Sequence, residues 1–311
     1  MISVVMSVYN EKIEWLEEAI DSILLQTYSN FELIIIVDNP LLPEHIRNCI
    51  ENKRAQDARI VVLYNESNLG LALSLNRGIS IARGSYIARM DADDIAFPER
   101  LQCEIDYLQK HGVDMVSTNA VIIDEESREL RERESSLENP MQLLRYSNNI
   151  VHPSVMIRSD VIRKVGGYRN FKRSQDYDLW LRLITAGYQI RTIDAHLMKY
   201  RVRSSSITKE GRLEQYYINL YQKNLYRERI RKGSDSFSED RLKAYLASKR
   251  ITDKKNRRCI KAVNILDNQK ENVWLRTIKA FLIFPSVTMR IVINNLKKRY
   301  MLFVNRREYL K

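Results

Sequence analysis

The sequence predicts an α/β fold in which helices flank an open sheet of mainly parallel strands, followed by a basic helical region. Two apolar runs of strand length, residues 2–8 and 31–38, are nearly continuous, as is typical of strands buried on both faces. Between them, residues 14–25 place apolar side chains at helical spacing. This alternation continues to residue 110 and implies right-handed crossovers between neighbouring parallel strands.

The remaining elements follow the same reasoning along the chain. We expect helices at 43–56, 70–83 and 98–110, and strands at 59–64, 85–90, 113–123 and 151–158. The charged segment 124–136 is expected to be a hairpin tip or a loop. A helix at 176–186, closed by Gly187, precedes strands at 188–193 and 197–202, and the chain is helical from about residue 210.

Charge divides the chain into two parts. The 311 residues carry a net charge of +12, but residues 201–311 alone hold 28 Lys and Arg against 10 Asp and Glu. We therefore expect a first domain over 1–205 and a basic, mainly helical module over 206–311. Such an excess of positive charge favours an anionic partner. A nucleic acid is not expected, because no recognisable RNA- or DNA-binding module is present.

The segment 273–303 is the best candidate for contact with a membrane. It mixes apolar and aromatic residues with Lys and Arg, and Pro285 interrupts it. Its charge-free run is too short for a spanning helix, which needs about 20 apolar residues. The segment predicts a pair of interfacial helices at an anionic membrane surface. The alternative is a helical subdomain whose aromatic residues pack on the first domain and whose charges are solvated.

The cysteines argue against a disulfide scaffold and a cysteine-based zinc site. Cys49, Cys103 and Cys259 are odd in number and far apart. We expect three inert thiols in a reducing compartment. No segment resembles a targeting signal.

Polar residues follow the first four predicted strands, at the edge where open α/β sheets bind ligands. These residues are Tyr9–Glu11, Asp38–Asn39, Asn65–Gly70 and Asp91–Asp94. Neither a GxGxxG fingerprint nor a phosphate-binding P-loop motif is present. The sheet is therefore expected to bind its ligand through acids and an aromatic residue.

The segment Met90–Asp94 is the most informative of these. Three carboxylates within four residues repel one another unless a cation or hydrogen bonds compensate. Asp91 and Asp93 can present oxygen ligands of the kind that Mg²⁺ and Mn²⁺ prefer. The alternative is structural, because Asp94 could cap the helix that begins near Pro98.

Seven segments, in this order, resemble the inverting family-two glycosyltransferases, which have the GT-A fold. They are MSVYNE (6–11), IIIVDN (34–39), NLGLALSLNRGI (68–79), GSYIARMDADD (84–94), HPSVMIRS (152–159), VGGY (165–168) and QDYDLWLRL (175–183). The resemblance covers about residues 1–205. It implies an open mixed sheet and the transfer of a sugar from a nucleotide-diphosphate donor to a hydroxyl, usually with Mn²⁺ or Mg²⁺.

The resemblance also implies roles for single residues. Tyr9 would stack on the base, Asp38 would bind the base or ribose, Asn68 would belong to the nucleotide site, and Asp91 would lie near the ribose and metal. Asp93 would ligate the metal that bridges the diphosphate.

The acceptor side is implied in the same way. Asp176 would be the general base, although by position alone it could equally cap a helix. His152 and Asp94 would lie near the donor sugar or the acceptor. Arg203 stands where relatives can have a histidine, and we expect it to hold the diphosphate, because arginine cannot ligate a metal. Arg182 is expected to form an ion pair with Asp178.

Two functions from different classes follow. The first is a glycosyltransferase that adds one sugar, with a UDP-sugar as the expected donor and a glycan or lipid-linked acceptor, in cell-surface polysaccharide synthesis. It would be cytoplasmic and peripheral at the membrane face. The second is a non-catalytic binding protein on the same scaffold, whose basic tail docks to membrane or nucleic acid. Asp91, Asp93 and Asp176 favour the enzyme.

Overall fold

The computed structural model describes residues 1–134, 139–203, 211–267 and 271–308, with 298–308 as backbone only. The chain divides into two compact units: Met1–Met141 with Asn149–Arg203, and Gln142–Asn148 with Ser204–Lys311. We expected the division after residue 205. The sequence did not predict that 142–148 would join the second unit.

The first unit is built on a mixed sheet. Its strands are β1 (Ile2–Val8), β2 (Phe31–Val37), β3 (Ile60–Tyr64), β4 (Tyr86–Asp91), β5 (Ile95–Ala96), β6 (Met115–Ile123), β7 (Glu129–Arg133), β8 (Met156–Arg158) and β9 (Ile190–Arg201). They are ordered β3-β2-β1-β4-β8-β6-β9-β5, with β7 paired to β6. The pairs among β1 to β4 are parallel, whereas β8 runs antiparallel to β4 and β6. The predicted open mixed sheet is confirmed.

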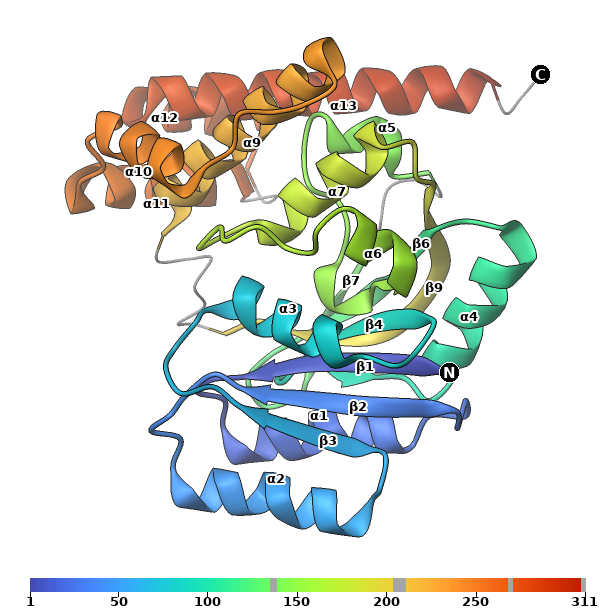
Figure 1. Cartoon of the computed structure of the whole chain (residues 1–311). Coiled ribbons are helices and arrows are strands. Elements are labelled where there is room, and N and C mark those ends of the chain that lie inside the picture. The colour runs from blue at the N-terminus through green and yellow to red at the C-terminus, as the bar shows by residue number, and fades with distance from the viewer. Residues whose placement is uncertain (135–138, 204–210, 268–270, 309–311) are drawn as a thin grey trace. The chain divides into compact units, whose positions relative to one another are not determined.

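Helices cover both faces of this sheet (Figure 1). They are α1 (Ile13–Leu24), α2 (Glu44–Gln56), α3 (Leu71–Ile81), α4 (Arg100–His111), α6 (Ser159–Lys164) and α7 (Gln175–Thr185). Buried residues of α1, α2 and α4 share one apolar cluster with β1 and β2. On the opposite face α3 approaches closely, because a Cβ on Gly78 would lie 2.6 Å from Val5 Cγ1 and 2.7 Å from Ile36 Cδ1.

Three predictions differ from the structure in detail. The strand expected at 151–158 begins only at Met156, because His152–Ser154 forms a 3₁₀ turn. Within the charged segment 124–136, residues 124–128 form a hairpin tip, which is one of the two predicted alternatives, but residues 129–133 form a strand, β7, that was not predicted. The two strands expected at 188–193 and 197–202 are a single strand, β9. The polar residues between them stay in the sheet because the register with β6 shifts there, and Asn119 Nδ2 donates to Asp194 Oδ1 at 2.9 Å.

The second unit is helical, as predicted. Its helices are α9 (Arg212–Lys232), α10 (Glu239–Ser248), α11 (Asp253–Asp267), α12 (Val273–Ile283) and α13 (Pro285–Glu308), while α5 (Met141–Leu144) begins at the last residue of the first unit's Met1–Met141 segment. Leu213, Cys259 and Val287 form a small buried cluster. The helix break predicted at Pro285 is confirmed. Among the residues described, no helix has both the length and the apolarity to cross a bilayer.

The three cysteines are unpaired, as predicted. Burial raises the pKa of both Cys49 and Cys259 to about 11. These two side chains therefore stay protonated at neutral pH and behave as small apolar groups.

Candidate active site

Three carboxylates gather where β4 ends. The parallel register pairs Asp91 with Ser7 of β1, so the acidic segment emerges at the carboxyl edge of the central strands. The Asp91 side chain is 29% exposed, whereas Asp93 and Asp94 are buried. Asp91, Asp93 and Asp94 each offer an oxygen, and these oxygens lie within 4.8 Å of one another. The clustering predicted from the sequence is thus present in three dimensions.

Burial and mutual repulsion act on these acids. Burial, with the charge of Asp91, raises the pKa of Asp93 to about 7, although Arg203 opposes this rise. Burial also raises the pKa of Asp94 well above its usual range, and Asp93 and Asp91 add to the effect. Such shifts mean that burial and the neighbouring acids disfavour the ionised forms of Asp93 and Asp94.

The residues fit a divalent cation. Asp94 Oδ1 accepts the backbone N–H of Arg201 at 2.8 Å, but the buried Oδ2 has no hydrogen-bond partner among the described residues. A buried carboxylate oxygen without a donor is costly unless a ligand satisfies it. Hard oxygen ligands of this kind suit Mg²⁺ or Mn²⁺, which also take substrate phosphates. Asp91, Asp93 and Asp94 could therefore hold such an ion.

Two arginines face the cluster from different elements. Arg89, within β4, is buried and forms an ion pair with Asp91. Arg203 follows β9, and its Nη2 lies 2.7 Å from Asp93 Oδ2. Its side chain is 29% exposed. Arg203 was a candidate from the sequence, whereas Arg89 was not identified there.

Glu11 also lies at the site, although the sequence indicated it only as one of the polar residues that follow the first strand. Its Oε2 accepts the backbone N–H groups of Tyr9 and Asn10 at 2.8 and 3.1 Å, and its Oε1 lies 3.9 Å from Arg203 Nη2. Burial raises the pKa of this carboxyl, although the hydrogen bond from Tyr9 and the charge of Arg203 oppose the rise. Its position directly after the first strand was the available signal.

The end of β2 forms the second part of the edge. Asp38 is buried, and its oxygens accept the N–H groups of Leu69 and Gly70, each at 2.8 Å, and the amide of Asn65 at 2.7 Å. These bonds hold the segment before α3 beside the edge. Asn68, in that segment, is exposed and accepts the Gly70 N–H at 3.0 Å.

Tyr9 lies next to Asp38 along this edge. The backbone N–H of Asp38 donates to Val8 O at 2.8 Å, and Asn39 Nδ2 donates to Tyr9 O at 3.0 Å. The Tyr9 side chain is 47% exposed, so its ring is available to a ligand. The candidates Tyr9, Asp38 and Asn68 therefore belong to neighbouring segments of one edge.

Asp176 lies in the first turn of α7 and is partly buried. The helix begins after Ser174, whose φ is 54°. Burial raises the pKa of Tyr168, and the negative charge of Asp176 adds to that rise, which places the two groups near each other. Further along α7, Arg182 Nε donates to Asp178 Oδ2 at 2.7 Å, so the predicted structural ion pair is confirmed.

His152 is held by aromatic neighbours. Its Nε2 lies 2.8 Å from the Tyr168 hydroxyl, and its ring packs edge-on to Trp180 at 5.9 Å between centroids. Burial, with the positive charge of Arg89, holds the pKa of His152 well below its usual range. The imidazole is therefore neutral at physiological pH and shares a hydrogen bond with the Tyr168 hydroxyl.

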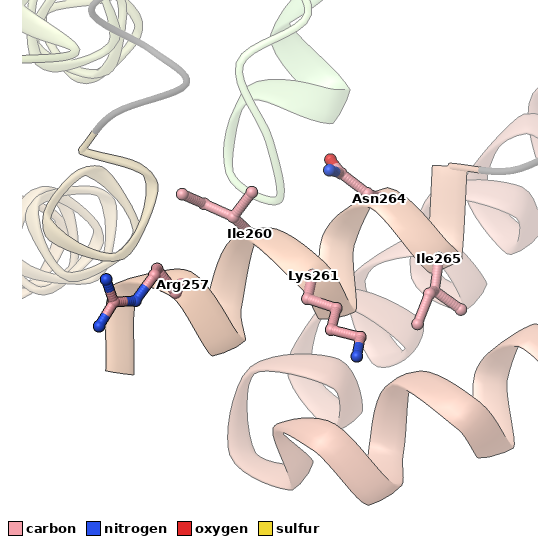
Figure 2. A pocket seen from close by; sticks show the side chains of 5 residues that line it. All are labelled: Arg257, Ile260, Lys261, Asn264 and Ile265. Atoms are coloured by element: carbon pink, nitrogen blue, oxygen red, sulfur yellow. The ribbon is translucent and has the colours of Figure 1, made fainter. Parts of the chain in front are cut away.

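A separate hollow of about 380 Å³ lies along α11 in the second unit. Figure 2 shows the five side chains that line it, namely Arg257, Ile260, Lys261, Asn264 and Ile265. It combines two cations with two apolar side chains and contains no carboxylate. The hollow therefore differs in chemistry from the acidic edge of the first unit.

The chain is similar to known glycosyltransferases. The family model described as Glycosyl transferase family 2 matches residues 3–166. An uncharacterized glycosyltransferase of Methanocaldococcus jannaschii is 36% identical over 233 residues, which cover 72% of this chain and 80% of that protein. The O-antigen biosynthesis glycosyltransferase WbnJ of Escherichia coli is 35% identical over 214 residues, covering 68% of this chain and 83% of WbnJ.

Solved structures show the same fold. The crystal structure of S. aureus TarS 1-349 in complex with UDP-GlcNAc has a TM-score of 0.60 at 16% identity, covering 79% of this chain and 70% of that one. The fold is therefore of the GT-A type that the sequence predicted. The chain belongs to glycosyl transferase family 2 and is a glycosyltransferase.

Proposed function

We propose that the protein transfers one sugar from a nucleotide-diphosphate donor, a UDP-sugar first of all, to a hydroxyl of a glycan or lipid-linked acceptor in cell-surface polysaccharide synthesis. The observation that carries this proposal is the carboxylate cluster of Asp91, Asp93 and Asp94 on the same sheet edge as Asp38. The O-antigen role in the name of WbnJ and the UDP-GlcNAc bound to TarS support the substrate class.

The donor nucleotide occupies the edge formed by the ends of β1 and β2. The exposed ring of Tyr9 stacks on the base. Asp38 and Asn68 shape the segment that borders the base and ribose, and Asp91 lies on the ribose side.

The diphosphate lies over the acidic cluster. Asp93 is the proposed ligand of a Mn²⁺ or Mg²⁺ ion, with Asp91 and Asp94 beside it, and the bound ion would neutralise charge on the departing diphosphate. The Arg203 guanidinium can hold phosphate oxygens bidentately.

Asp176 is the proposed general base. Its carboxylate lies in the first turn of α7 and can accept a proton from a hydroxyl. Asp176 takes the proton of the acceptor hydroxyl as that oxygen bonds to the anomeric carbon. The bond from this carbon to the diphosphate oxygen breaks on the opposite side, and its electron pair leaves with the nucleotide. His152 and Asp94 border the donor sugar or acceptor.

Nucleotide binding tests the donor site. We would measure thermal stabilisation by a panel of nucleoside diphosphates with Mn²⁺, Mg²⁺ or EDTA, because a ligand that binds the folded state raises the melting temperature. The variants are Asp93→Ala and, as a control, Asp106→Ala, whose exposed carboxylate accepts only a Gln102 amide among the described contacts. We expect one nucleotide to stabilise with metal, and Asp93→Ala alone to abolish the effect. No stabilisation by any nucleotide would contradict the proposal.

The second unit is proposed to hold the enzyme at the cytoplasmic face of an anionic membrane. On α12, Trp274, Ile278 and Leu282 recur every four residues and are 79%, 55% and 75% exposed. On α13, Met289, Ile293 and Leu296 continue with exposed apolar side chains. Apolar helix faces within a unit of high positive charge match an anionic lipid surface. A lipid-linked acceptor would be presented at the same surface.

A further inference from the structure

The Arg203 guanidinium places a positive charge next to Asp93. Its Nη2 lies 2.7 Å from Asp93 Oδ2 and 3.9 Å from Glu11 Oε1. Its guanidinium carbon lies 5.6 Å from the centre of the Trp15 ring, which supports it by a cation–π contact. Two carboxylates and an aromatic face thus bind the Arg203 side chain where a divalent ion would meet Asp93.

Arg89 and Arg203 differ in their freedom to move. The Arg89 side chain is 5% exposed, its backbone is paired within the sheet, and its carbonyl accepts Nη2 of Arg100 at 2.8 Å. Arg203 lies beyond the last residue of β9 and is 29% exposed. Its ion pair can therefore open without disrupting the sheet, whereas the charge of Arg89 is fixed beside Asp91.

A divalent ion on Asp93 Oδ2 would lie next to the Arg203 guanidinium that already binds this oxygen. The two cations repel each other at such a distance, so each weakens the binding of the other to Asp93. A diphosphate changes this balance, since it supplies anionic oxygens to both cations.

We propose that Arg203 is the resident counter-cation of Asp93, which a divalent ion must displace, so that metal and nucleoside diphosphate bind cooperatively. This inference rests on the proposed donor site. In the free protein Arg203 neutralises Asp93 and Glu11 and weakens metal binding. When the metal and diphosphate enter together, the guanidinium turns from Asp93 to the phosphate oxygens. The affinity for the metal is therefore high only when the nucleoside diphosphate is bound.

Mn²⁺ binding without turnover tests this role. Bound Mn²⁺ would be titrated by electron paramagnetic resonance in the full chain, with and without UDP, for the wild type, Arg203→Met and Arg203→Lys. The control is Arg158→Met, which removes an equal charge from an exposed pair with Asp160. Melting temperatures of all variants show that each is folded.

We expect Arg203→Met to bind Mn²⁺ alone about tenfold more tightly than the wild type, because a neighbouring positive charge is gone. UDP should then raise its Mn²⁺ affinity less than in the wild type. Arg203→Lys and the control should stay close to the wild type in Mn²⁺ alone.

A Mn²⁺ affinity of Arg203→Met within about twofold of the wild type would overturn the inference, since the lost charge would then not compete with the ion. Failure of the donor site itself would look different. In that case the wild type would bind no UDP with any metal, whereas the titration with Mn²⁺ alone would still show whether Arg203 competes.

Discussion

Asp38 Oδ2 accepts the backbone N–H of Gly70 at 2.8 Å, and this bond fixes the entry of α3 beside the sheet edge. Gly70 has a φ of 83°, a conformation that a side chain would strain. The Asp38 carboxylate therefore stabilises the segment before α3 in the free protein. A nucleotide would bind beside a segment that is already positioned.

Replacing Asp38 by Asn should loosen this segment. The amide nitrogen cannot accept a backbone N–H, so the bond from Leu69 or from Gly70 is lost, and of these two donors only Gly70 has a second acceptor among the described residues, Asn68 Oδ1 at 3.0 Å. We expect the free energy of unfolding to fall by about 1–3 kcal/mol and UDP binding to weaken. Urea denaturation and calorimetry measure the two effects. Unchanged values for both would show that the carboxylate does not hold the segment.

Asp176→Asn should remove the general base. We expect kcat to fall by roughly 10²- to 10⁴-fold with little change in the affinity for nucleotide, because the amide cannot accept the acceptor's proton. Rates of sugar transfer and UDP affinity would be measured on the same preparations. A variant that retains wild-type kcat would assign the base to another residue.

Asp178→Ala, two residues away on α7, should affect stability instead. Asp178 is fully buried and pairs with Arg182 at 2.7 Å, so its removal leaves a buried guanidinium with one partner fewer. We expect a loss of about 3–5 kcal/mol in the free energy of unfolding. Chemical denaturation tests this, and equal effects of Asp176→Asn and Asp178→Ala on stability would argue against the different roles of the two acids.

His152 should make the protein sensitive to acid. Its pKa is lower in the folded protein than in the unfolded chain, where it is about 6.5. The unfolded chain therefore takes up the proton first, and the free energy of unfolding falls as the pH drops below about 6.5.

The substitution His152→Gln removes this titration. The stability advantage of the wild type over His152→Gln should shrink between pH 7 and pH 5, as followed by urea denaturation at each pH. A difference that does not depend on pH would mean that His152 has the same pKa in the folded protein as in the unfolded chain.

The apolar faces of α12 and α13 should govern lipid binding. Trp274→Glu combined with Leu282→Glu should lower binding to vesicles of mixed neutral and acidic lipids by roughly tenfold or more, because apolar area is no longer buried. The control is Leu130→Glu combined with Leu25→Glu, which adds the same charge at sites of the first unit that are 56% and 72% exposed. Sedimentation with vesicles measures binding. Equal binding of the α12 double variant and the wild type would contradict the membrane proposal.

The sequence predicted the parallel half of the sheet well because β1 and β2 are buried on both faces and read as continuous apolar runs. The prediction of two strands in place of β9 was wrong, because nothing in the local sequence indicates that Asp194 pairs with Asn119 across a register shift. The turn at His152 was missed for a similar reason, because its apolar neighbours resemble a strand.

For the site, the clustered acids were predictable because neighbouring strand ends meet at one edge. Arg89 was not identified, although a charged residue inside a buried strand requires a partner, and Asp91 is two positions further on. The ion pair of Arg203 with Asp93 depends on the position of β9 in the sheet, which the local sequence does not specify.

The arrival of β9 beside the acidic cluster has a consequence for how the protein folds. Arg201 Nε donates to Asp93 O at 2.8 Å across a separation of 108 residues. Contacts so distant along the chain carry a large loop-closure entropy and form slowly. The parallel core of β1 to β4 can therefore assemble first. Catalytic competence would then appear after the core has formed, when the last strand docks and delivers Arg203.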